Sequence, residues 1–115
     1  MVTFTEDDLE QILLGWLEEL GWTHVYGPDI APGEVGAERD DYRETVLDGR
    51  LVAAVTRLNP ELSPGAVAEV LRTAKRAESP VVESENWRCY RYLIEGVPVE
   101  YRDADGALRT ARARL

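Results

Sequence analysis

Basic and aromatic side chains between residues 39 and 57 offer the clearest opportunity for chemistry in this sequence. This arginine set comprises Arg39, Tyr42, Arg43, Arg50 and Arg57, and its last three members are seven residues apart. On a helix this spacing places them in one stripe. A guanidinium group pairs bidentately with phosphate or carboxylate, so the stripe suits either a grip on DNA or docking onto a neighbouring domain. The third interpretation is a solvent-exposed helix face on which Glu44 and Asp48 form ion pairs with the arginines.

Other kinds of catalytic centre have little support. A thiol nucleophile needs a base, but the chain has one histidine, His24, and one cysteine, Cys89, with no orienting signature around either. We expect His24 to lie half-exposed on a strand and Cys89 to be a small core group. A structural zinc site needs about four Cys or His ligands. The chain has only two such residues, so we expect it to bind no zinc. No Gly-x-x-x-x-Gly-Lys loop is present, so we expect it to bind no ATP.

The elements that would position these residues begin with a helix over residues 5–21. Thr5 is placed to cap its first amides, Asp8 completes a capping box, and Gly21 ends it. One broad apolar stripe repeats at helical spacing along it. Its members are Leu9, Ile12, Leu13, Trp16, Leu17 and Leu20.

A short strand and a second helix are expected next. Trp22–Tyr26 alternates like a strand, and a Gly/Pro-rich loop follows to about residue 38. The second helix is predicted to begin at Asp41 or Tyr42 and to end at Leu58, where Asn59-Pro60 stops it.

Two further helices and a hairpin complete the expected fold. Ser63-Pro64 supplies a cap and a first-turn proline for a third helix. Trp87, Tyr90 and Ile94 mark a fourth helix that ends before Gly96. Residues 97–102, a turn at 103–106 and residues 107–115 form a β-hairpin. The fold class is therefore α+β, with about four helices and an incomplete sheet.

Composition limits the chain to one modest folded domain or a fragment of one. It has 115 residues, 44% of them hydrophobic, and a net charge of −9. Residues 1–48 carry −11 and residues 49–115 carry +2, so the front half should repel DNA. No apolar run approaches the ~20 residues that cross a bilayer, and no signal peptide is visible. The single cysteine fits a reducing cytoplasm, so we expect a cytoplasmic protein without membrane contacts.

Five stretches together carry a family resemblance that covers nearly the whole chain. They are Glu38–Leu51, Arg57–Pro60, Thr5–Glu10, Gly27–Pro32 and Glu95–Tyr101. With them the chain resembles the start of type I restriction enzyme R subunits. The resemblance implies a parent that cleaves unmodified foreign DNA with Mg²⁺ and translocates it with ATP. It also implies partners: the rest of the R subunit, the methyltransferase and specificity subunits, and DNA through the parent complex.

The nuclease site that the resemblance implies needs an aspartate, a second acid and a lysine around a divalent ion. The only lysine is Lys75, and Thr73 stands two residues before it, so no acid-x-Lys triplet exists. Pro28-Asp29 followed by Asp41–Arg43 imitates the order of the motif. However, Pro28-Asp29 is expected in a loop, and arginine holds its proton too firmly to act as a base. The acids of the family lie on later strands, so we expect no complete catalytic site and no cofactor in this chain.

Glu6 and Glu10 are the weak metal candidates, because related nucleases add a glutamate from a helix. Their alternative role is to satisfy the helix dipole. The resemblance implies that helix 5–21 and hairpin 96–115 belong to a restriction-endonuclease-like core, with residues 22–95 as a mostly helical insertion. We therefore expect a catalytically incomplete scaffolding or docking piece of an R subunit. The rival interpretation is a stand-alone acidic interaction protein, such as a DNA mimic or an inhibitor.

Overall fold

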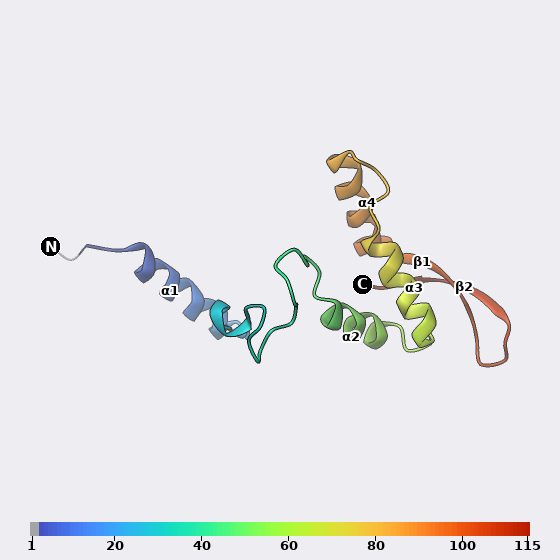
Figure 1. The fold of residues 1–115 in the computed structure, drawn as a ribbon, viewed down its shortest axis with the longest axis horizontal. Helices are drawn as coiled ribbons and strands as arrows, with labels where there is room; N and C mark the ends of the chain where they lie inside the picture. The colour runs from blue at the N-terminus through green and yellow to red at the C-terminus, as the bar shows by residue number, and fades with distance from the viewer. Residues whose placement is uncertain (1–2) are drawn as a thin grey trace. The chain divides into compact units, whose positions relative to one another are not determined.

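The computed structural model describes residues 3–115, which form two compact units (Figure 1). The first unit extends to Glu44 and holds α1 (Glu6–Glu19) and a short 3-10 helix, η1 (Gly27–Ile30). The second unit begins at Thr45. It contains α2 (Asp48–Leu58), α3 (Pro64–Lys75), α4 (Val82–Glu95), β1 (Val97–Arg102) and β2 (Leu108–Ala113). Four α-helices and one antiparallel hairpin in the described residues confirm the α+β class and the incomplete sheet.

The ends of α1 are specified by local hydrogen bonds, as predicted. The Thr5 hydroxyl accepts from the Asp8 amide at 3.2 Å, and the Asp8 carboxylate accepts from the Thr5 amide at 2.9 Å. Gly21, with φ of 89°, allows the chain to turn back at the C-terminus. There the Trp22 amide donates to the Leu17 carbonyl at 3.0 Å. No residue of α1 is buried, so its apolar stripe is left exposed.

The predicted strand at residues 22–26 is wrong. These residues have no regular secondary structure, and Trp22 and Tyr26 remain exposed. A strand requires a neighbour to receive its amides and carbonyls, and both strands of the described chain lie in the second unit. Alternation in the sequence showed which side chains could share a face, but not whether a partner strand exists.

The second helix begins later than predicted. The sequence indicated a start at Asp41 or Tyr42, whereas α2 begins at Asp48. Local hydrogen bonds form a turn in place of the expected helix: the Asp41 carboxylate accepts from the Arg43 amide at 2.8 Å, and the Asp41 carbonyl accepts from the Glu44 amide at 3.0 Å. Aspartate competes in this way with helical backbone bonding.

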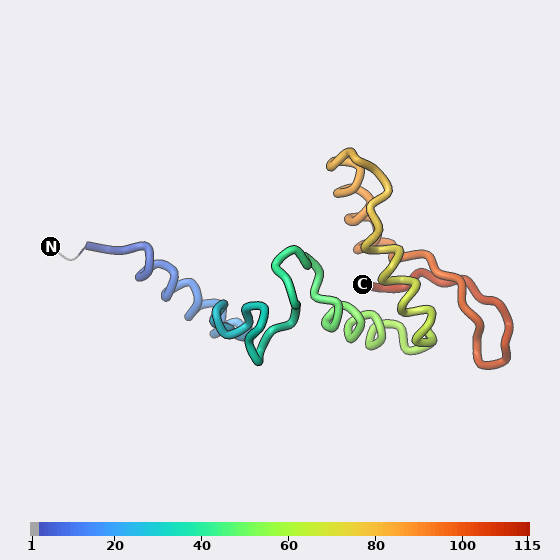
Figure 2. The backbone as a smooth tube through the Cα atoms, in the orientation of Figure 1, coloured from blue at the N-terminus to red at the C-terminus, as the bar shows by residue number. Residues whose placement is uncertain are grey.

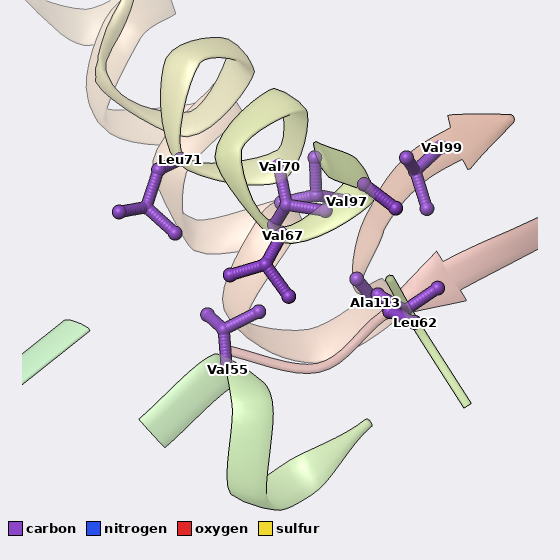
Figure 3. Packing of buried hydrophobic residues seen from close by; sticks show 9 residues of the cluster. Val55, Leu62, Val67, Val70, Leu71, Val97, Val99 and Ala113 are labelled. Carbon is purple, nitrogen blue, oxygen red and sulfur yellow. The ribbon is translucent and has the colours of Figure 1, made fainter. Parts of the chain in front are cut away.

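The core of the second unit lies between α2, α3 and the inner face of the hairpin (Figure 3). Figure 3 shows Val55 of α2 and Val67 of α3 pointing toward each other. All nine core residues are small or medium-sized, which gives a modest core. They are Val55, Leu62, Ala66, Val67, Val70, Leu71, Val97, Val99 and Ala113.

The start of α3 and the hairpin agree with the sequence. Ser63 caps α3 by accepting from the Ala66 amide at 3.3 Å, and Pro64 occupies the first turn. In the hairpin, Val97 lies opposite Ala113, and the pairing continues to the other end of both strands. The turn at residues 103–106 is closed by hydrogen bonds to Asp103.

Gly96 is where the chain passes from α4 directly into β1, as the backbone trace shows (Figure 2). Its φ is 82°, a region that residues with a side chain rarely adopt. A Cβ atom here would lie 2.9 Å from the Ala113 carbonyl oxygen. A glycine is therefore required at this junction. It fixes the direction in which the chain passes from α4 into β1.

Candidate functional site

The arginine set does not form one helical stripe. Arg39, Tyr42 and Arg43 lie in the irregular end of the first unit, whereas Arg50 and Arg57 belong to α2. The prediction of a stripe with a seven-residue repeat is therefore wrong, because the helix that would align its members begins after Arg43. Their role in contacting DNA or another domain stays a prediction.

Arg39 and Tyr42 do form a defined local structure. The Arg39 guanidinium lies over the Tyr42 ring at 5.1 Å from its centroid, and its Nη1 donates to the Glu44 carbonyl at 3.2 Å. This packing holds an arginine in a fixed orientation at the surface, which suits recognition of a carboxylate or phosphate. The sequence placed both residues in the set but gave no sign of this contact.

Glu6 and Glu10 lie in the first two turns of α1, and both are exposed. Glu6 shares the first turn with Asp7 and Asp8, where acids interact favourably with the helix dipole. Within residues 3–115 no group of three or more His, Cys, Asp or Glu side chains is arranged to hold a metal ion. A metal role for Glu6 and Glu10 stays a prediction that requires ligands from elsewhere.

The placements of His24 and Cys89 differ from expectation. His24 lies on the irregular segment after α1 and is exposed, and no strand supports it. Cys89 was expected in the core, yet it is an exposed residue of α4. The core is filled by α2, α3 and the hairpin, which leaves no place in it for a side chain on that face of α4.

An ion pair on the inner face of α4 was not anticipated from the sequence. Arg88 donates to the Glu85 carboxylate from Nη2 at 2.7 Å and from Nε at 3.1 Å, and both side chains are less than a fifth exposed. The other Glu85 oxygen accepts from the amides of Glu78 and Ser79 at 3.0 and 2.9 Å. The hydrogen bond from Arg88 lowers the pKa of Glu85. Together these bonds tie the start of α4 to the segment after α3.

Arg88 extends this network to α3 and to an aromatic ring of its own helix. Its Nη1 donates to the Thr73 carbonyl of α3 at 3.4 Å, and its guanidinium lies over the Tyr92 ring at 5.2 Å. The hydrogen bond to Glu85 raises the pKa of Arg88, which keeps the group charged. The spacing of Glu85 and Arg88, three residues apart on one helix, was the signal in the sequence that would have found the pair.

A second charged group lies at the other end of α4. Arg91 donates to Glu95 at 2.8 Å, and Arg112 of β2 approaches the same carboxylate at 3.7 Å. The hydrogen bond from Arg91 lowers the pKa of Glu95. Both charged groups line one open hollow of about 520 Å³ beside α4. Each arginine of this hollow pairs with a glutamate, so the arrangement positions α4.

Comparison with known proteins gives one consistent result. A sequence profile described as "Type I restriction enzyme R protein N terminus" matches residues 3–112. The chain is 36% identical over 96 residues to the type I restriction enzyme HindI endonuclease subunit of Haemophilus influenzae, covering 84% of this chain and 9% of that protein. It is 26% identical over 107 residues to the putative type I restriction enzyme MjaIXP endonuclease subunit of Methanocaldococcus jannaschii, covering 93% and 10%. No solved structure gives a significant match.

Proposed function

Because the chain belongs to the family of type I restriction enzyme R protein N termini, we propose that it acts as the N-terminal scaffolding and docking segment of an R subunit. The match over residues 3–112 is the observation that carries this proposal. The chain spans about a tenth of the length of the two relatives, so cleavage and translocation belong to the proposed parent and not to these residues alone.

Two features of the structure support a scaffolding role, because each would be stabilised by packing against further residues. The apolar stripe of α1 is exposed, and the hairpin is a two-stranded sheet in the described residues. A hairpin of this size is marginal alone, and a helix with an exposed apolar stripe gains stability only when that stripe is covered. In the proposed parent, α1 and the hairpin pack into a restriction-endonuclease-like nuclease core, and the later residues of the R subunit supply the acidic ligands for Mg²⁺.

We propose two separate docking segments, one in each unit: the irregular segment that carries Arg39, Tyr42 and Arg43, and the part of α2 that carries Arg50 and Arg57. Partners in this proposal are the remaining R subunit, the methyltransferase and specificity subunits, and DNA within that complex, in the cytoplasm and as part of defence against foreign DNA. ATP binding is assigned to the motor of the parent. Among residues 3–115, no helix is long and apolar enough to span a membrane.

A chimeric R subunit tests the proposal directly. The N-terminal segment of the HindI endonuclease subunit that matches this chain is replaced by residues 1–115, and restriction of unmodified phage is measured beside ATP-dependent DNA translocation. We expect both activities to persist at a reduced level. A chimera that assembles with its partner subunits and translocates DNA, yet never restricts, would limit the chain to a role outside the nuclease core. Failure to assemble at all would overturn the proposal.

A further inference from the structure

Two residues of β1 and its turn reveal which backbone groups of the hairpin face outward. Proline has no amide hydrogen, so Pro98 cannot exchange a pair of hydrogen bonds with Arg112, the residue opposite it. Further along, the Asp103 amide donates to the Ala107 carbonyl at 3.0 Å, so that pair is hydrogen-bonded. Because bonded and non-bonded pairs alternate in an antiparallel ladder, these two observations agree and fix the alternation along both strands.

The outer edge of β2 consists of the residues whose backbone groups turn away from β1. They are Leu108, Thr110 and Arg112. Among residues 3–115 no other backbone group bonds to this edge, and the sheet stops at two strands. The outer edge of β1 lacks a donor at Pro98, and proline is one of the residues that blunt an edge strand. The edge of β2 therefore presents the more complete row of donors and acceptors.

Asn59 fills the C-terminal end of this row. Arg114 continues the alternation of Thr110 and Arg112, so its backbone amide and carbonyl face the same edge. Both bond to the Asn59 side chain: the amide donates to Oδ1 at 2.8 Å, and the carbonyl accepts from Nδ2 at 2.9 Å. A carboxamide carries a donor and an acceptor, as a peptide group does. The buried Asn59 thus takes the place of a residue in a neighbouring strand.

We propose that a further strand of the R subunit pairs with β2 along Leu108–Arg112 and ends before Arg114, where Asn59 occupies the edge. This inference rests on the proposed function, which supplies the rest of the subunit. The chain spans about a tenth of the length of its two relatives, so most of such a subunit lies outside these residues. An extended backbone is the partner whose donors and acceptors repeat at the spacing of a sheet edge.

The side chains of β2 indicate the character of the added strand. Arg112 and Arg91 share the single carboxylate of Glu95, at 3.7 and 2.8 Å, which leaves one positive charge unmatched. Leu108 lies on the same face of the sheet as Arg112 and is 62% exposed. We expect an acid across from Arg112 and an apolar residue across from Leu108. A second copy of β2 contains no acid, so it matches this edge less well.

Proline substitutions at two opposite residues test the proposal. Thr110→Pro removes an outward amide from β2, and Glu100→Pro, directly across the ladder, removes one from β1 and is the matched control. Neither change removes a hydrogen bond between the two strands. Each variant is made in the chimeric R subunit that carries residues 1–115 in place of the matching HindI segment.

Hydrogen–deuterium exchange of residues 108–112 is the readout, measured by mass spectrometry. We expect this segment to exchange about tenfold more slowly in the chimera than in the 115-residue chain, because a paired edge is protected. Glu100→Pro should keep this slowing and Thr110→Pro should abolish it, with exchange in α2 and α3 unchanged in both. Equal exchange in the chain and the chimera, or slowing that survives Thr110→Pro, would overturn the proposal.

The 115-residue chain provides a second test that needs no chimera. By nuclear magnetic resonance, the Arg114 amide should exchange about tenfold more slowly than the Thr110 amide, because Asn59 covers only the former. A protected Thr110 amide would overturn the proposal; if that protection grew with concentration, a second copy would be the occupant. A chimera that shows slow exchange but fails to assemble with its partner subunits would contradict the proposed function alone.

Discussion

Asn59 and Arg114 are joined by a reciprocal pair of hydrogen bonds across 55 residues of sequence. The Asn59 amide group donates from Nδ2 to the Arg114 carbonyl at 2.9 Å, and the Arg114 backbone amide donates to Asn59 Oδ1 at 2.8 Å. Asn59 Nδ2 also donates to the Val55 carbonyl at 2.8 Å. Asn59 is 2% exposed, so water cannot replace these bonds, and the end of α2 is fastened to the end of β2.

Replacing Asn59 should therefore be costly in so small a core. We expect Asn59→Ala to lower the free energy of unfolding by about 3 kcal/mol, at roughly 1 kcal/mol for each of three hydrogen bonds. Urea unfolding followed by circular dichroism measures the change. Asn86→Ala, an exposed position on α4, is the matched control and should be close to neutral. Equal stability of the two variants would contradict the role of this contact.

Acid should weaken the attachment of α4 through Glu85. The pKa of Glu85 is lowered from its ordinary value of 4.5, chiefly by the hydrogen bond from Arg88. A lowered folded-state pKa means that the stabilisation is complete above about pH 4.5 and is lost as the pH falls through the lowered value. Glu85→Gln should thus reduce the melting temperature at pH 7, and its difference from the wild type should shrink in acid. Glu100→Gln, on the outer face of β1, should show neither effect.

Capping should decide how much helix the first unit retains. No residue of α1 is buried, so its stability depends on local interactions more than on packing. We expect Thr5→Ala to remove about 1 kcal/mol of helix stability and to reduce the helical circular dichroism signal at 25 °C. Thr3→Ala, outside the capping box, is the control. An unchanged signal in Thr5→Ala would mean that other contacts hold α1.

The arginine set should matter to assembly more than to folding. We expect the triple change of Arg43, Arg50 and Arg57 to Gln to leave thermal melting of the chain nearly unchanged, because exposed ion pairs contribute only about 0–1 kcal/mol each. The same changes in a full-length R subunit that carries this segment should impair restriction of phage. A collapsed melting transition would place these arginines in the fold, and normal restriction would leave them as an ordinary solvated face.

The isolated chain should neither cleave DNA nor hydrolyse ATP. The reason is chemical: it has no acid-x-Lys triplet and no phosphate-binding loop. Plasmid cleavage with Mg²⁺ and phosphate release from ATP are the measurements. Mg²⁺-dependent cleavage that survives repurification and disappears in Glu6→Ala would overturn this expectation and make Glu6 a metal ligand.

Features set by a few neighbouring residues were predictable from the sequence. The capping box at Thr5, the cap and proline at Ser63-Pro64, and the turn before Gly106 each depend on interactions within a few positions, and all three are confirmed. The strand at residues 22–26 failed because a strand needs a distant partner that the pattern does not reveal.

The start of α2 and the organisation around α4 could not be predicted for related reasons. A single turn at Asp41 outcompeted the helical pattern and separated Arg43 from Arg50 and Arg57. Arg88 of α4 donates to the Thr73 carbonyl of α3 and to Glu85, and the tertiary contact with Thr73 joins the two helices. Arg88 and Thr73 lie 15 positions apart in the sequence, so no local pattern reveals their contact.

The uneven charge of the two units also determines how a protease would divide the molecule. Trypsin cleaves after arginine and lysine, and the first such residues in the chain are Arg39 and Arg43, immediately before the first unit ends at Glu44. Every later basic residue belongs to the second unit. Brief digestion would therefore release α1 and η1 together as one acidic peptide. Trypsin would thus separate the two units without any substitution in the sequence.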